Sequence, residues 1–260
     1  MSKRFAYCLC PSYRKPICLQ SSMWLFERQT YPYKRMYILE DSGTVPHGRI
    51  GDIVILSTEK RFPNLPLKYQ YLLDILKPVL RPNDAIFVWD DDDVYLEDYI
   101  EKHMEVLKGY PVSKLSEGFT YYASALYYDK SMLGHSALSF RAECLDVVSG
   151  WPLTGAMDFD AQFISKLQEN FEFGDPRKLG PPSFIHRWTL LSGYHSSALS
   201  TGPKDEGWYR KIDEILGPKE NAYYFLEPRP DPGLIPLMEA AKFMIEQNKK
   251  CMEFYSKNGI

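Results

Sequence analysis

The chain has 260 residues, enough for one large domain or two small ones with a sizeable buried core. Its formal net charge is −3, so no overall excess of positive charge points to nucleic acid or to an anionic membrane surface. No apolar run approaches the length of a membrane span, which predicts a soluble, cytoplasmic protein. The five cysteines are odd in number and include no CxxC pair, a pattern typical of free thiols in a reducing compartment.

The first part of the chain alternates short apolar runs with a segment of helical spacing. We predict strands at 5–10 and 34–39 and a helix at 17–29 between them. Strand, helix and strand of these lengths form a βαβ unit, which implies a parallel pair of strands. The second strand runs into Glu40 and Asp41, although an aspartate at this place, shortly before a glycine, also fits an ordinary turn.

A third strand is predicted at 53–56, followed by a helix at 67–76 that ends before Pro78. Lys68 lies in the first turn of this helix, where a positive charge gains nothing from the helix dipole. Its position suits a contact with a phosphate or a base, and it equally suits an ordinary surface lysine.

Four consecutive aspartates, Asp90 to Asp93, follow directly on an apolar run at 85–89. Such a run is typical of a buried strand that ends at the carboxyl edge of a sheet, where ligands of open α/β sheets bind. Four carboxylates repel one another unless a positive charge lies among them, and Mg²⁺ or Mn²⁺ prefers carboxylate oxygens and substrate phosphates. The stretch predicts a metal–diphosphate site; the alternative is a solvated acidic loop that caps the next helix.

The second half of the chain continues the alternation. We predict helices at 95–107, 142–148 and 161–168 and strands at 119–128 and 136–141. Asp158 and Asp160 precede the last of these helices, so one alternative is that they serve only as its N-cap and a first-turn acid.

Basic and aromatic residues gather at 181–200, where Arg187 is followed by Trp188. Arg187 is expected either to clamp a phosphate or to pair with one of the many acids. Further on we predict a helix at 205–216, a proline-rich linker at 228–236 and a C-terminal helix at 237–255. The apolar face of the last helix favours packing on the core over membrane binding.

In chain order, these motifs resemble those of GT-A fold glycosyltransferases, and of family 2 in particular. The resemblance covers about residues 5–197. It is carried by four motifs: Pro11-Ser12-Tyr13-Arg14, Glu40-Asp41-Ser42-Gly43-Thr44, the aspartate run followed by Val94-Tyr95-Leu96, and the stretch from Trp151 to Asp160, with Gly193-Tyr194-His195 in support. It implies a single α/β GT-A domain at 1–200, Rossmann-like, with a mostly parallel central sheet. The nucleotide-binding half would span about 1–95 and the acceptor half about 96–200, with a C-terminal helical extension at 201–260.

The function that the resemblance implies is a metal-dependent, inverting transfer of a sugar from a nucleotide sugar to a hydroxyl acceptor. A UDP-sugar is the preferred candidate for the donor. The cofactor would be Mn²⁺ or Mg²⁺, and the acceptor stays open between a glycan, a protein and a modified nucleic acid. A nucleotidyltransferase of similar fold is an alternative, but the glycine-rich phosphate loop of those enzymes is missing at 11–14. A non-catalytic protein that binds carbohydrate or Ca²⁺ is a further alternative.

The resemblance also implies roles for single residues. The expected donor-binding residues are Pro11, Ser12, Tyr13, Arg14, Asp41, Lys68, Asp90 and Asp91. Asp92 would hold the metal together with His195, with His186 in reserve. Asp158 would be the general base that removes the acceptor's proton, and Asp160 is its local alternative. The chain departs from the family at Met157, where a glutamate is common.

Overall fold

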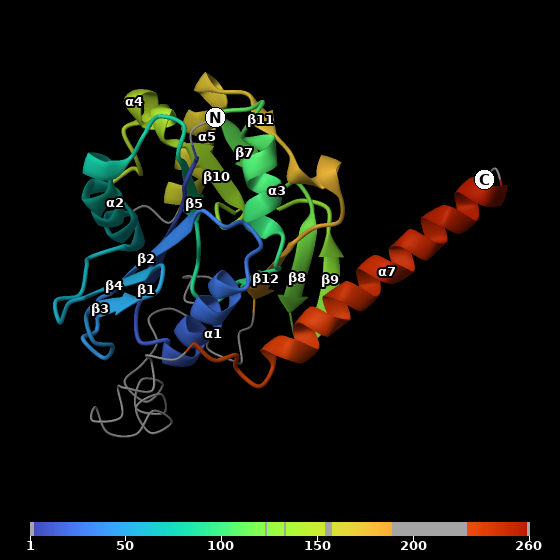
Figure 1. Ribbon diagram of the computed structural model, residues 1–260, viewed down its shortest axis with the longest axis horizontal. Coiled ribbons are helices and arrows are strands. Elements are labelled where there is room, and N and C mark those ends of the chain that lie inside the picture. The colour runs from blue at the N-terminus through green and yellow to red at the C-terminus, as the bar shows by residue number, and fades with distance from the viewer. Residues whose placement is uncertain (1–2, 123, 133, 154–157, 189–227, 259–260) are drawn as a thin grey trace.

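The structure is a computed structural model that describes residues 3–122, 124–132, 134–153, 158–188 and 228–258. Sheets and helices form an α/β body, from which the C-terminal helix α7 (Leu234–Asn258) runs outward (Figure 1). The first turns of α7 are buried at Leu234, Leu237 and Ala241, whereas Phe243 is exposed. None of the helices in the described ranges has the length and apolar character needed to span a membrane.

The main sheet has eight strands in the order β11-β7-β10-β5-β1-β2-β4-β3. They are β1 (Ala6–Ser12), β2 (Lys34–Glu40), β3 (Gly48–Ile50), β4 (Ile53–Ser57), β5 (Ala85–Val88), β7 (Val112–Lys114), β10 (Leu138–Arg141) and β11 (Phe173–Gly174). The four strands β4, β2, β1 and β5 are parallel, which confirms the predicted βαβ unit.

The prediction of a mostly parallel sheet was wrong, because the sheet is mixed. Strand β10 runs antiparallel to both β5 and β7, and β3 runs antiparallel to β4. The β3–β4 hairpin turns at Gly51, whose φ of +55° lies in the left-handed region that glycine adopts at little cost. A three-residue strand beside such a turn carries too little apolar pattern to be predicted from sequence.

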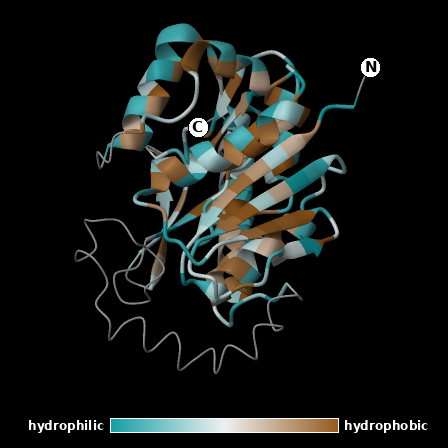
Figure 2. Cartoon of the chain, turned by 90° about the vertical axis from the view of Figure 1, so that its left-hand side faces the viewer, coloured by the Kyte–Doolittle hydropathy of each residue, from teal (hydrophilic) through white to brown (hydrophobic). Residues whose placement is uncertain are grey.

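The helices cover both faces of this sheet and bury two apolar clusters. They are α1 (Pro16–Glu27), α2 (Leu65–Leu76), α3 (Tyr99–Val106), α4 (Leu145–Val148) and α5 (Phe159–Asn170), with 3₁₀ turns at Lys77–Val79, Ala142–Cys144 and Pro176–Leu179. Alternate side chains of β1 point to opposite faces: Cys8 belongs to the cluster that includes residues of α1, α3 and α7, and Leu9 to the cluster that includes residues of α2, α4 and α5. In Figure 2 several strands are brown over much of their length. The cysteines with described side chains, Cys8, Cys10, Cys18 and Cys144, are free, as predicted, and all four are buried.

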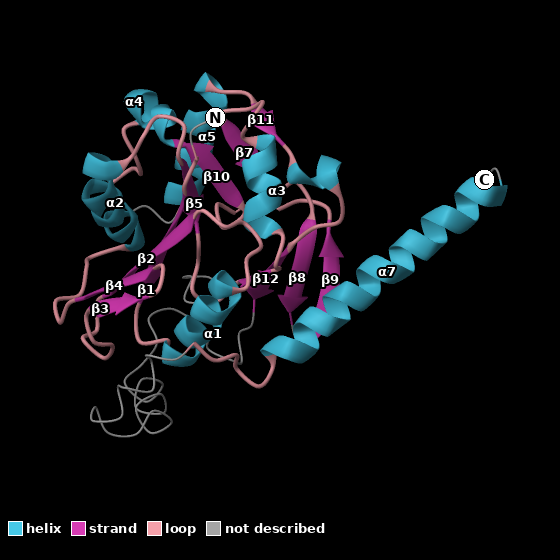
Figure 3. Cartoon of the chain, in the orientation of Figure 1, coloured by secondary structure: helices cyan, strands magenta, loops and turns pink. Residues whose placement is uncertain are grey.

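A second sheet has the order β6-β12-β8-β9 and lies beside the first (Figure 3). Its strands are β6 (Val94–Tyr95), β12 (Phe184–Trp188), β8 (Gly118–Tyr122) and β9 (Ala125–Asp129). The single strand predicted at 119–128 is therefore an antiparallel hairpin. Strand β6 also shortens the helix predicted at 95–107, since α3 begins only at Tyr99. Because β6 pairs with β12, the end of the aspartate run is brought beside 184–188.

Candidate active site

The carboxyl ends of β1 and β5 bring the first turn of the chain against the aspartate run. The two strands are parallel neighbours, with Leu9 opposite Val88, so the residues that follow each strand emerge at the same edge. There the Ser12 hydroxyl donates to Asp91 Oδ2 at 2.6 Å. Two motifs that lie almost 80 residues apart in the sequence therefore form one site.

Asp91 and Asp92 both pair with the ammonium of Lys15. The Lys15 nitrogen is 2.5 Å from Asp92 Oδ2 and 3.5 Å from Asp91 Oδ1. Burial raises the pKa of the Asp91 carboxyl to about 6, although Lys15 opposes the rise. Burial would lower the pKa of Lys15, but the two carboxylates outweigh it and raise that pKa above its ordinary value. Lys15, Asp91 and Asp92 therefore form a buried ion cluster with two carboxylates and one ammonium.

Asp90 is held by hydroxyl groups instead. Tyr69 Oη donates to Asp90 Oδ1, and Ser136 Oγ donates to Asp90 Oδ2 at 2.6 Å. The backbone N–H of Asp90 donates to Tyr95 Oη at 2.8 Å, and His135 Nε2 lies 3.9 Å from Asp90 Oδ2. These contacts come from α2, from β6 and from the residues before β10, so three separate segments hold the start of the aspartate run.

Asp93 faces the second sheet. Its Oδ1 accepts a hydrogen bond from the Arg187 backbone N–H at 3.0 Å and lies 3.2 Å from His186 Nδ1. Burial alone would lower the pKa of His186, but Asp93 raises it to about 9, helped by the charges of Asp92 and Asp90. The imidazole is therefore charged at neutral pH and paired with Asp93.

Arg187 links the aspartate run to the C-terminal segment. Its Nε donates to the carbonyl oxygen of Asp92, and its Nη1 is 3.0 Å from Asp231 Oδ2. Asp231 also accepts from Ser21 Oγ at 2.9 Å. Both Arg187 and Asp231 are buried, so of the two expectations for Arg187 the structure places it in an ion pair with an acid.

Asp41 and Lys68 form a second buried ion pair, at the carboxyl end of β2. Lys68 Nζ pairs with Asp41 Oδ1 and donates to the Ser12 carbonyl oxygen at 2.9 Å. The Phe62 N–H donates to Asp41 Oδ2 at 2.7 Å. Burial lowers the pKa of Lys68, while Asp41 opposes the change. The surface-lysine alternative for Lys68 was wrong, because its side chain is 9 % exposed.

Positive charge surrounds Tyr13 in the turn after β1. The Arg61 guanidinium carbon lies 4.2 Å from the centroid of the Tyr13 ring, Lys68 Nζ 5.5 Å and the Arg14 carbon 5.9 Å. The Arg14 backbone, with φ of +50°, donates to Glu40 Oε1 at 3.4 Å. Three cations around one aromatic ring suit a ligand that is both planar and anionic.

Asp158 and Asp160 lie at the start of α5, as predicted from their spacing. Asp158 occupies the N-cap position without a capping hydrogen bond from its side chain, and its Oδ1 accepts from Gln162 Nε2 at 2.9 Å. Asp160 Oδ1 accepts from the Ala161 N–H at 2.8 Å. Asp158 is exposed. His195 lies outside the described residues.

The described residues include no group of three His, Cys, Asp or Glu side chains arranged to hold a metal ion. Asp91 and Asp92 nevertheless fit Mg²⁺ or Mn²⁺ as two hard oxygen donors, because these ions take their remaining ligands from water and phosphate. Sequence reasoning missed Lys15, Tyr69 and Ser136. Of these three residues, only Lys15 could have been found from the sequence, because it directly follows the Pro11-Ser12-Tyr13-Arg14 motif.

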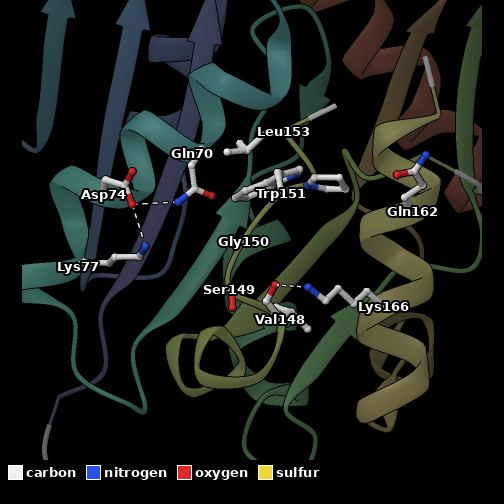
Figure 4. A pocket seen from close by; sticks show the side chains of 11 residues that line it. Gln70, Asp74, Lys77, Val148, Ser149, Gly150, Trp151, Leu153, Gln162 and Lys166 are labelled. Carbon is white, nitrogen blue, oxygen red and sulfur yellow. Dashed lines mark hydrogen bonds and ion pairs between the residues drawn. The ribbon is translucent and has the colours of Figure 1, made fainter. Parts of the chain in front are cut away.

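A cavity of about 650 Å³ lies along the second half of α2, between it and α5 (Figure 4). None of its lining residues belongs to the aspartate run. Two stacked rings lie between the cavity and the aspartate run. The ring centroid of Trp151, which lines the cavity, is 4.7 Å from the ring centroid of Tyr69. Tyr69 in turn donates to Asp90.

The sequence matches no family model and no curated protein. Among solved structures, S. aureus TarS 1–349 in complex with UDP-GlcNAc is similar, with a TM-score of 0.55 over 86 % of this chain and 70 % of that chain, at 10 % identity. Mannosyltransferase PcManGT from Pyrobaculum calidifontis, in complex with GDP-Man and Mn²⁺, has a TM-score of 0.51 over 92 % of this chain and 79 % of that one, also at 10 % identity.

The match to the longer S. aureus TarS chain covers 81 % of this chain but 42 % of that one, with a TM-score of 0.52 and 10 % identity. This chain therefore spans less than half the length of that relative. Identity at this level establishes the fold alone: the chain shares the fold of these solved structures, which is the GT-A fold expected from the sequence motifs.

Proposed function

We propose that this chain transfers a sugar from a nucleotide sugar to a hydroxyl acceptor. The preferred candidate for the donor is a UDP-sugar. The observation that carries the proposal is the contact of Ser12 and Lys15 with Asp91 and Asp92 at the carboxyl ends of β1 and β5. Ligands of open α/β sheets bind at this edge. Solved structures of the same fold include complexes with UDP-GlcNAc and with GDP-Man and Mn²⁺.

The donor's base and ribose are assigned to the turn Pro11 to Arg14 and to the Asp41–Lys68 pair. Asp41 is fully buried, so it acts on the donor by holding Lys68 in place. Of the three cations around Tyr13, Arg61 is assigned to the diphosphate, because its side chain is exposed and its guanidinium carbon lies 4.2 Å from the ring centroid, with Arg14 and Lys68 close by. Negative charge on the ligand complements them.

The carboxylates of Asp92 and Asp91 would hold Mn²⁺ or Mg²⁺, whose charge would offset that of the departing diphosphate. Asp90 is tied to Tyr69 and Ser136, and its role is to fix the loop and the ribose of the donor. His195 remains the predicted third ligand.

The transfer step itself needs a base for the acceptor hydroxyl. Asp158 is proposed for this role because it is exposed at the start of α5 and makes no capping hydrogen bond. Its carboxylate accepts the hydroxyl proton as the acceptor oxygen attacks the anomeric carbon from the side opposite the leaving diphosphate, which inverts that carbon. Gln162, which donates to Asp158 Oδ1, orients the carboxylate.

Calorimetric titration with UDP and GDP in the presence of Mn²⁺ tests the donor site. Arg61→Met removes a charge beside Tyr13, and Lys60→Met is a matched control, since both side chains are exposed and adjacent in sequence. We expect Arg61→Met to weaken nucleotide binding by about tenfold, the value of one hydrogen bond to a charged group, and Lys60→Met to change it little. Equal affinities for the two variants, or no binding of either nucleotide to the wild-type chain, would contradict the proposal.

A further inference from the structure

Lys15 lies between two carboxylates in a place that water reaches poorly. Its side chain is 10 % exposed, and those of Asp91 and Asp92 are 5 % and 12 % exposed. Carboxylates this deeply buried depend on protein charges or bound ions for neutralisation, because solvent screens them weakly. The Lys15 ammonium supplies that positive charge in the structure.

One ammonium does not balance two carboxylates. With all three groups ionised, Asp91, Asp92 and Lys15 together carry one negative charge. A divalent cation bound to the same two carboxylates would neutralise them fully. At Asp91 Oδ1 and Asp92 Oδ2, the oxygens that Lys15 Nζ contacts, it would take the place of the ammonium, because two cations at that spacing repel each other strongly in a buried site.

We propose that Lys15 and a divalent cation compete for Asp91 and Asp92, so that the metal binds only when the ammonium leaves them. The inference rests on the proposed function, which assigns the metal to these carboxylates. Lys15 thereby sets the metal affinity of the site. Once displaced, its ammonium is free to pair with the donor's diphosphate, the other anion that the site takes.

The surroundings of Lys15 permit this exchange. Lysine carries its charge on a flexible four-carbon stem, so it moves without the backbone. The two ligand residues keep other supports: Ser12 Oγ donates to the Asp91 carboxylate at Oδ2, and Arg187 Nε donates to the backbone carbonyl oxygen of Asp92. Neither contact involves Lys15, so the Asp91 carboxylate and the Asp92 backbone stay in position after it leaves.

The test is a calorimetric titration of the full chain with Mn²⁺ alone, without donor or acceptor. Lys15→Met is expected to tighten Mn²⁺ binding by roughly 5- to 150-fold, the usual range for coupled binding. Lys15→Arg keeps the cation and is expected to show no such gain. Lys102→Met is the matched control, because the Lys102 side chain is 12 % exposed and is paired with Asp98 instead.

The outcomes separate this inference from the proposed function. If Asp92→Asn removes Mn²⁺ binding but Lys15→Met binds Mn²⁺ no more tightly than Lys102→Met, the competition is refuted and the proposed metal site stands. If no folded form of the chain binds Mn²⁺, the competition and the metal assignment are both refuted. UDP binding by the same samples then shows whether the donor site survives.

A second measurement uses the wild-type chain, in case Lys15→Met does not fold with two unpaired carboxylates. The chain is acylated at its amines with and without Mn²⁺, and labelling of each lysine is followed by mass spectrometry. Mn²⁺ is expected to speed labelling of Lys15 at least about fivefold, the lower end of the same coupling range, and to leave Lys102 unchanged. A Lys15 rate that does not respond to saturating Mn²⁺ overturns the proposal.

Discussion

The pairing of His186 with Asp93 makes the stability of the chain depend on pH in a defined window. Asp93 raises the pKa of His186 from 6.5 to about 9 against the opposing effect of burial. At 1.36 kcal/mol per pKa unit, this net rise, which includes the cost of burial, corresponds to about 3 kcal/mol of folding stability when the imidazole is charged in both states. The imidazole side chain is 24 % exposed, so solvent screening removes little of that value.

The sign follows from the direction of the shift. A histidine whose pKa is raised on folding contributes its full stabilisation below pH 6.5 and loses it as the pH rises through about 9. His186→Gln removes this dependence. Groups that titrate in the same window in both proteins, such as Lys114 with its pKa lowered by burial to about 8, cancel in the comparison.

Urea unfolding at pH 6 and pH 9.5 measures the effect. Between these values the wild-type chain should lose about 3 kcal/mol more stability than His186→Gln. His47→Gln serves as the control, because His47 is exposed and should leave the wild-type profile unchanged. Identical pH profiles for the wild-type chain and His186→Gln would refute the argument that Asp93 holds a charged imidazole.

Three further substitutions test the donor site, the base and the link to the C-terminal segment. Asp41→Asn should raise the KM for the nucleotide sugar more than it lowers kcat, since base and ribose contacts are equal in ground and transition states; a large fall in kcat at unchanged KM argues against this role. Asp158→Asn should lower transfer by about 10²–10⁴-fold while calorimetry shows unchanged UDP binding, and Asp160→Asn should transfer nearly normally; the reverse result would move the base by two residues. Arg187→Met should lower the free energy of unfolding by about 3–5 kcal/mol in urea melts, because Asp231 is left buried and unpaired, and a loss below about 1 kcal/mol would contradict that pairing.

The parallel half of the sheet could be predicted from sequence because its signals are local. The apolar runs that became β1, β2 and β5 are each bounded by turn residues, and helix α1 between the first two shows its own spacing. The antiparallel half could not. Strand β10 runs antiparallel beside β5, and the 119–128 run folds back on itself as β8 and β9. Both outcomes depend on tertiary pairing, which a run of β-forming residues does not specify.

The candidate site divides in the same way. The aspartate run was found because four carboxylates directly after a strand are a contiguous signal. Tyr69 and Ser136 were not, because they reach Asp90 from α2 and from the residues before β10, far away in the sequence. Lys15 directly follows the Pro11 to Arg14 motif, but only the folded chain shows that its ammonium lies between Asp91 and Asp92.

Hydrolysis of nucleotide sugars is the most direct test of the central claim, since many sugar transferases slowly transfer the sugar to water when no acceptor is present. The wild-type chain is incubated with Mn²⁺ and a panel of UDP- and GDP-sugars, and release of the free nucleoside diphosphate is measured beside Asp92→Asn. We predict release from at least one donor and its loss in Asp92→Asn, with the melting temperature of the variant close to that of the wild-type chain. Binding of a nucleotide sugar without any release, or release that Asp92→Asn leaves unchanged, would contradict the account.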